Sequence, residues 1–181
     1  LNPSSAASDV YKRQGLEITE LCFGTSSLGS MPDTYGYEVS EDRAQKTLNR
    51  FFQGPANMLD TSRNYAMGES ERRIGNAVKE NGGWPKDLLL STKLDRDMDT
   101  LVLDKNRARQ SFEESLKTLN VDSVDILFLH DPEYAKDVND ITKKDGAMDE
   151  LFKIKEEGLA KAVGLAMGKI DLMFPLIKDW D

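Results

Sequence analysis

The chain has 181 residues, of which 31% are charged, and a formal net charge of −8 at pH 7. This composition is typical of a single soluble globular domain, and its acidity argues against nucleic acid or an anionic membrane as a general partner. A single cysteine, Cys22, excludes an internal disulfide and favours a reducing compartment, and no apolar run approaches the length needed to span a bilayer. We therefore predict a cytoplasmic protein without membrane association.

The first 14 residues differ in character from those that follow. Residues 4–14 are polar, show no periodicity and resemble the translated adapter sequence that recurs at the edges of assembled environmental sequences. We expect residues 1–14 to be a non-native or disordered leader and residues 15–181 to hold the folded domain. A native disordered tail is the alternative interpretation of this leader.

From Gly15 onward, short apolar runs that predict strands alternate with amphipathic stretches that predict helices, at roughly 35 residues per pair. After an entry hairpin that begins at Gly15, the expected strands cover residues 19–25, 57–61, 88–94, 124–129 and 162–167. The expected helices cover residues 40–53, 68–81, 104–119, 147–157 and 170–180, with long loops at residues 26–37 and 131–146. The alternation predicts an α/β fold with a parallel sheet, namely an incomplete (β/α)8 TIM barrel with about five of the eight βα units.

Four polar residues lie at or just after the ends of the predicted strands. Asp60 lies at the end of the second predicted strand, Tyr65 follows five residues later, and Lys93 and His130 come at the ends of the next two apolar runs. Because the carboxyl ends of parallel barrel strands open onto one face, we expect these four side chains to converge there.

Each of these residues alone has a structural explanation: a turn cap for Asp60, a loop anchor for Tyr65, a snorkelling lysine for Lys93 and a buried structural role for His130. Together they suit proton transfer. A phenol titrates near 10, so Tyr65 needs a nearby cation that lowers its pKa before it can exchange protons near neutrality. Lys93 can be that cation, Asp60 can hold the ammonium in place, and His130 can donate a hydrogen bond to a substrate oxygen.

Other common site chemistries are not supported by the sequence. There is no Gly-x-Gly-x-x-Gly or Walker motif for nucleotide phosphates and no Gly-x-Ser-x-Gly elbow for a serine nucleophile. One histidine and one cysteine without clustered ligands exclude a zinc site, so we expect no metal.

Several segments, in order, resemble the aldo-keto reductase family. They are Phe23–Gly29, Asp60–Tyr65 with Gly68–Gly75, Leu90–Lys93 and Leu129–His130. The resemblance covers residues 15 to about 170, as in an N-terminal fragment of that family. Residues 130–133 and 158–167 are most similar to the aldose 1-dehydrogenase branch, which includes L-fucose, D-threo-aldose and pyridoxal dehydrogenases.

The resemblance implies an enzyme that binds NAD(P)(H) at the open face of a barrel, with the preference for NAD or NADP undecided. It implies hydride transfer between the nicotinamide and the carbonyl or hemiacetal carbon of a small sugar or aldehyde. Tyr65 would be the general acid in reduction and the base in oxidation, Lys93 and Asp60 would tune it, and His130 would orient the substrate.

The resemblance also implies contacts to the cofactor and the substrate. Gly24 and Thr25, together with Asp60, would line the nicotinamide-ribose end, and Met167-Gly168 replaces the asparagine-containing pair that usually holds the carboxamide. Tyr35 and Tyr37, in the loop after the first strand, are candidates for the substrate entrance.

Two alternatives to an active enzyme remain open at this stage. One is a non-catalytic, cofactor-sensing relative with the same fold, and the other is an inert truncated fragment whose open sheet exposes two edges. The oligomeric state is left open. Glu69 and Glu71 are interpreted as acids in the first turn of a helix, where they suit the helix dipole.

Overall fold

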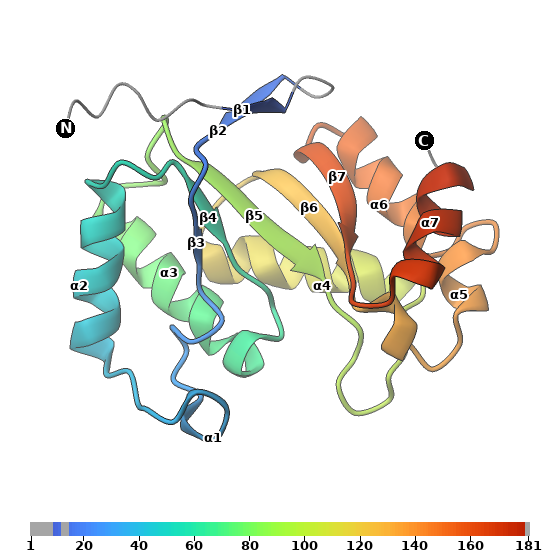
Figure 1. Cartoon of the computed structure of the whole chain (residues 1–181), viewed down its shortest axis with the longest axis horizontal. Coiled ribbons are helices and arrows are strands. Elements are labelled where there is room, and N and C mark those ends of the chain that lie inside the picture. The colour runs from blue at the N-terminus through green and yellow to red at the C-terminus, as the bar shows by residue number, and fades with distance from the viewer. Residues whose placement is uncertain (1–8, 12–14, 180–181) are drawn as a thin grey trace.

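The computed structural model describes residues 9–11 and 15–179, and its elements follow the alternating order predicted from the sequence (Figure 1). The strands are β1 (Asp9–Tyr11), β2 (Leu16–Ile18), β3 (Cys22–Gly24), β4 (Met58–Asp60), β5 (Leu89–Leu94), β6 (Val124–His130) and β7 (Ala160–Ala166). The helices are α1 (Pro32–Tyr35), α2 (Glu41–Phe52), α3 (Glu69–Glu80), α4 (Lys105–Leu119), α5 (Asn139–Thr142), α6 (Ala147–Glu156) and α7 (Ile170–Asp179), with 3-10 turns η2 (Tyr65–Gly68) and η3 (Pro132–Tyr134).

The main sheet contains five parallel strands in the order β3-β4-β5-β6-β7. Helices lie between successive strands along the chain, so the prediction of an α/β fold with a parallel sheet is confirmed. The two loops expected between elements are partly helical, because α1 lies in the first and η3 and α5 lie in the second.

The entry hairpin differs from its prediction. Strand β2 pairs in antiparallel fashion with β1, so that Val10 lies opposite Glu17, and β3 instead pairs in parallel with β4. The partner of β2 therefore comes from the segment that we expected to be a leader, and the hairpin begins before Gly15. The remaining residues of that leader, 1–8 and 12–14, lie outside the described residues, and its non-native origin stays a prediction.

Local capping explains where two of the long helices begin. The hydroxyl of Ser40 accepts a hydrogen bond from the amide of Arg43 at the start of α2, at 3.2 Å. The carboxylate of Asp104 accepts from the amide of Arg107 at the start of α4, at 2.8 Å. Both side chains satisfy amides that have no partner within the helix.

The helices α2, α3, α4 and α6 contact one another in that order and cover one face of the sheet (Figure 1). The core between these two layers contains fully buried side chains from both, such as Leu59, Leu90 and Leu127 from the strands and Ile74 and Phe112 from the helices. This packing fixes the positions of the strands and therefore of the loops at their carboxyl ends.

The opposite face of the sheet has a smaller apolar cluster toward the amino ends of its strands. Met58, Ile126 and Ala162 pack there with Leu16, which comes from β2. The hairpin thus covers the amino end of this face, and polar residues occupy its carboxyl end. Within the described part of the chain, no helix has both the length and the apolar character needed to cross a membrane.

Candidate active site

Strand alternation places the predicted residues on the face opposite the helices. Asp60 is two residues after Met58, and His130 is four residues after Ile126, so each shares a face with a member of the smaller apolar cluster. In the register of the sheet, Asp60 lies beside Ser91 and Lys93 lies beside Phe128. All three polar residues therefore lie at the carboxyl end of one sheet face.

Lys93 forms the centre of the site. Its ammonium Nζ lies 2.7 Å from Oδ2 of Asp60 and donates to the carbonyl oxygen of Thr61 at 2.6 Å. The Lys93 side chain is only 5% exposed, and a buried ammonium is tolerated when it is paired and hydrogen-bonded in this way. These contacts explain why a lysine stands near the end of an apolar strand.

Tyr65 and His130 complete the group. The Nζ atom of Lys93 lies 4.7 Å from the centroid of the Tyr65 ring. The rings of Tyr65 and His130 meet edge to face, with centroids 6.1 Å apart and an interplanar angle of 88°. The structure thus brings together the four residues that the sequence singled out, although their catalytic roles stay predictions.

The turn that carries Tyr65 depends on Gly68. Ala66, Met67 and Gly68 all have positive φ values, of 51°, 56° and 90°. A Cβ atom at Gly68 would overlap the guanidinium of Arg63, so only glycine fits this position without rearrangement. A backbone held in such sparsely populated conformations is typical of functional sites.

The pKa of Tyr65 differs in direction from our expectation. Burial raises it above the ordinary value of a phenol, and although Lys93 lowers it, the negative charges of Asp60 and Asp95 raise it further. We expected Lys93 to lower the pKa of the phenol toward 7. That expectation was wrong for the net pKa, because the effect of burial outweighs the effect of the Lys93 charge. Tyr65 is a protonated phenol at neutral pH.

Sequence reasoning missed Asp95, which is fully buried and contacts His130. Its Oδ1 atom lies 2.6 Å from Nδ1 of His130, and its Oδ2 atom accepts hydrogen bonds from the Ser62 hydroxyl at 2.7 Å and the Asn64 amide at 3.2 Å. The sequence could have indicated this residue, because Asp95 follows Lys93 by two residues and strand alternation places both side chains on the same face.

The interpretation of Glu71 from the sequence was incomplete. It lies in the first turn of α3 as expected, but its side chain is fully buried and accepts a hydrogen bond from the Thr92 hydroxyl at 2.7 Å. Burial raises its pKa to about 7, against the lowering effects of that hydrogen bond and of the Arg63 charge. Glu71 therefore lies behind the strand that carries Lys93, on the side of the helices.

Of the predicted cofactor residues, two lie beside Asp60. Gly24 pairs with Asp60 in the sheet and faces open space, since a Cβ atom there would meet no other atom within 4 Å. Thr25 is buried, and its hydroxyl donates to the carbonyl oxygen of Asp60 at 2.8 Å, so it supports the end of β4. After β7, the amide of Gly168 donates to Glu133 at 2.6 Å, and Met167 lies just before it.

The predicted substrate residue Tyr35 lies in α1. Its hydroxyl donates to the hydroxyl of Ser26 at 2.6 Å, and its ring lies near that of Tyr37. No contact of Tyr35 with the four central residues is found within the described residues, so its role at a substrate entrance stays a prediction.

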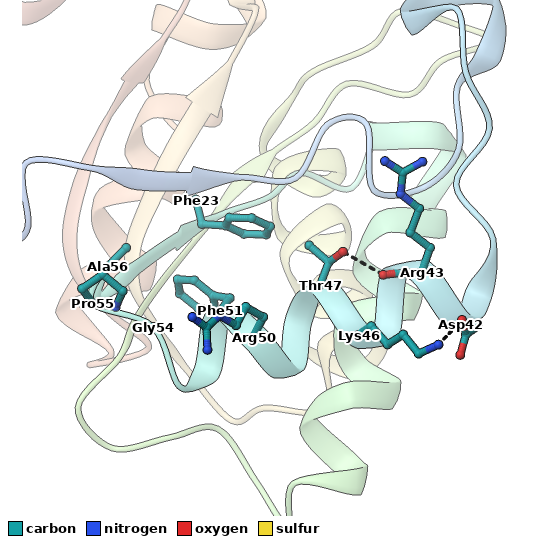
Figure 2. Close-up of a pocket in the computed structure, with 10 residues that line it drawn as sticks. All are labelled: Phe23, Asp42, Arg43, Lys46, Thr47, Arg50, Phe51, Gly54, Pro55 and Ala56. Carbon is teal, nitrogen blue, oxygen red and sulfur yellow. Dashed lines mark hydrogen bonds and ion pairs between the residues drawn. The ribbon is translucent and has the colours of Figure 1, made fainter.

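A pocket of about 550 Å³ lies elsewhere, between β3 and α2 (Figure 2). The rings of Phe23 and Phe51 stack on each other in its wall, with centroids 5.1 Å apart, and Arg43, Lys46 and Arg50 from α2 also line it. None of the four central residues lines this pocket, so its size alone does not make it the active site. The strand ends carry the reactive groups instead.

Comparison with known proteins identifies the family. A family model described as the aldo/keto reductase family matches residues 20–176. The L-galactose dehydrogenase of Arabidopsis thaliana is 32% identical over 158 residues, which are 87% of this chain and 47% of that protein. The D-threo-aldose 1-dehydrogenase of Pseudomonas sp is 28% identical, over 92% of this chain and 55% of that protein.

A solved structure supports the fold. The aldo-keto reductase from Bacillus halodurans in its holo form has a TM-score of 0.73 and 23% identity, and the match covers 92% of this chain and 52% of that one. This confirms that the five parallel strands and their helices form part of a (β/α)8 barrel. The chain spans about half the length of the curated relatives it matches. With the family model covering most of its length, the chain belongs to the aldo/keto reductase family.

Proposed function

We propose that the protein acts as an NAD(P)-dependent oxidoreductase on a small sugar or aldehyde. It would interconvert a carbonyl or hemiacetal with the corresponding alcohol or lactone. The observation that carries this proposal is the convergence of Asp60, Lys93, Tyr65 and His130 at the carboxyl ends of neighbouring parallel strands. The names of the two curated relatives, both dehydrogenases of sugars, support a substrate of the aldose class.

The residues at the strand ends are compatible with a nicotinamide cofactor. Gly24 leaves open space next to Asp60, whose side chain is 24% exposed, so the end of β3 offers room for a planar ring and its ribose. We propose that Gly24, Asp60, Met167 and Gly168 line this cofactor, with Thr25 fixing the backbone of Asp60. When bound, NAD(P)(H) would supply the hydride donor or acceptor, and its preferred form is left open.

The protein's own residues would handle the proton. Tyr65 keeps its proton at neutral pH, because burial raises its pKa, and so it can donate a hydrogen bond or a proton to a substrate oxygen. Lys93 opposes this rise, and its ion pair with Asp60 fixes the distance at which its charge acts. His130 lies at the edge of the Tyr65 ring and would contact the same oxygen.

Replacing one hydroxyl tests the mechanism. Tyr65→Phe is expected to lower kcat for reduction of an aldehyde or aldose by NAD(P)H by roughly 10²–10⁴-fold, because it removes the group that donates the proton to the substrate oxygen. Binding of the cofactor and the thermal unfolding midpoint should change little. Turnover is measured from the absorbance of NAD(P)H.

The matched control is Tyr134→Phe, which removes the hydroxyl of a tyrosine that is 52% exposed and contacts Arg96 and Lys169 through its ring. This variant should retain the activity of the parent. Unchanged turnover in Tyr65→Phe would contradict the proposed mechanism. The lack of any NAD(P)-dependent turnover in the parent would favour one of the two alternatives, a non-catalytic relative or an inert truncated fragment.

A further inference from the structure

His130 is held by a carboxylate that none of the proposed roles uses. Oδ1 of Asp95 lies 2.6 Å from Nδ1 of His130, and the Asp95 side chain is fully buried. A contact this short between a ring nitrogen and a carboxylate oxygen requires one proton between them. The question is which of the two groups supplies that proton.

The surroundings of Asp95 identify it as the acceptor. Its other oxygen, Oδ2, already accepts from the hydroxyl of Ser62 at 2.7 Å and from the amide of Asn64 at 3.2 Å. Such donors favour the ionised, acceptor-only form of a carboxylate. The hydroxyl of Ser62, 3.3 Å from Nδ1, is engaged with Asp95. Nδ1 of His130 must therefore carry the hydrogen that it donates to Asp95.

This assignment determines what the other ring nitrogen can do. A neutral imidazole carries one hydrogen, so with Nδ1 protonated the Nε2 atom is a hydrogen-bond acceptor. The charged groups around the ring are Asp95 on the Nδ1 side, Asp131, whose Oδ2 atom is 3.8 Å from Nε2, and Lys93 beyond the Tyr65 ring. None of them donates a hydrogen bond to Nε2 within the described residues.

We infer that Asp95 is a positioning residue that keeps the hydrogen of the singly protonated His130 ring on Nδ1, so that Tyr65 and His130 together recognise a substrate hydroxyl. The phenol donates to the hydroxyl oxygen, and Nε2 accepts the hydroxyl hydrogen. A carbonyl oxygen has no hydrogen to offer Nε2, so it fits this pair less well than an alcohol or a hemiacetal does. The inference rests on the proposed function for its substrate site, and it narrows that substrate to the hydroxyl form.

Replacing Asp95 by asparagine should reverse the arrangement. The backbone amide of Asn64 can only donate, so the side-chain oxygen of the asparagine must occupy the Oδ2 position. Its NH2 group then faces Nδ1 of His130 and donates to it. The hydrogen of the neutral ring moves to Nε2, which becomes a donor suited to a carbonyl oxygen.

Nitrogen NMR of the imidazole gives a direct test, because His130 is the only histidine of the chain. The protein is labelled with ¹⁵N-histidine and titrated to alkaline pH until both ring nitrogen shifts stop changing. We expect the protonated nitrogen to be Nδ1 in the parent and Nε2 in Asp95→Asn. Asp131→Asn, which alters the carboxylate on the other side of the ring, should keep the parent pattern.

The measurement on the parent decides the inference even if Asp95→Asn does not fold. Hydrogen on Nε2 in the parent overturns the role of Asp95. Equal populations of the two neutral forms overturn it as well, because they would show that Asp95 does not select one.

Ligand binding tests the second half of the inference without cofactor. Benzyl alcohol and benzaldehyde serve as a matched hydroxyl and carbonyl probe, and their dissociation constants are measured from the shifts of the His130 nitrogens. Asp95→Asn is expected to weaken binding of the alcohol relative to binding of the aldehyde by about three- to tenfold, the usual effect of one hydrogen bond. An unchanged ratio overturns the recognition of a hydroxyl.

These outcomes separate the inference from the proposed function. A parent with hydrogen on Nδ1 and the expected change in ligand ratio, but without NAD(P)-dependent turnover, would retain this inference and lose the proposed function. Turnover that depends on Tyr65 in a protein with hydrogen on Nε2 of His130 would retain the proposed function and overturn this inference.

Discussion

At the scale of single residues, Glu71 links stability to pH. Its pKa of about 7 in the folded protein is above the ordinary 4.5, because burial disfavours the charged form. The folded state therefore binds more protons than the unfolded state between these two values, and stability falls as pH rises through this window. The contribution is fully present below pH 4.5 and is lost as pH passes 7.

We predict that Glu71→Gln removes this pH dependence. Glutamine can accept from Thr92 as Glu71 does and stays neutral, so the variant should resemble the protonated parent. The difference in unfolding free energy between the variant and the parent should grow in favour of the variant as pH rises from 4.5 to 8, by on the order of 3 kcal/mol in total. This figure follows from about 1.36 kcal/mol per pKa unit. Urea unfolding of both proteins at several pH values measures this gain, and parallel stability curves would contradict it.

The sequence located the four central residues because their positions follow from chain direction alone. Parallel strands end on one edge, and Asp60, Lys93 and His130 each end an apolar run. The pKa of Tyr65 could not be predicted in the same way, since it depends on how deeply the ring is buried. The burial of Glu71 was readable in principle, because it precedes Ile74 and Val78 by three and seven residues on one helix face.

At the scale of elements, the contact between α3 and α4 depends on the absence of a side chain. Gly75 is buried in α3, and a Cβ atom there would overlap the backbone oxygen of Thr118 in α4. A backbone atom cannot move aside as a flexible side chain could, so the two helices would have to separate.

We predict that Gly75→Ala destabilises the protein by about 3 kcal/mol, although glycine to alanine in an unobstructed helix normally stabilises by about 1 kcal/mol. The reason is the lost packing between α3 and α4. Asn76→Ala, at the exposed position next to it, is the control and should stay within about 0.5 kcal/mol of the parent. The free energy of urea unfolding distinguishes the two, and equal values would show that the helices can adjust.

At the scale of the whole molecule, the five-stranded sheet has two outer strands, β3 and β7, and no further described strand pairs with either. Outer strands present unpaired backbone groups to other chains. Leu21, directly before β3, is 76% exposed and adds apolar surface at this edge. The sequence predicted such open edges from the number of βα units, but it did not predict that β1 would pair with β2, because residues 9–11 carry no strand periodicity.

We predict that residues 1–181, produced by themselves, associate with one another as their concentration rises, through the β3 edge. Leu21→Lys should lower this tendency, because a charge at an edge strand opposes pairing. Met98→Lys adds the same charge in the loop after β5, at a residue that is 42% exposed, and should have little effect. Sedimentation velocity over a range of concentrations measures association, and a parent that stays monomeric throughout would contradict the prediction.

The Asp95 carboxylate also has a mechanical consequence. Through Ser62 and Asn64 it holds the turn that leads directly into Tyr65, and through its other oxygen it holds His130. Tyr65 and His130, which follow different strands, are thereby both held in place by the Asp95 carboxylate. Thermal motion of the loops would then displace the phenol and the imidazole in concert, so that their separation fluctuates less than the position of either one.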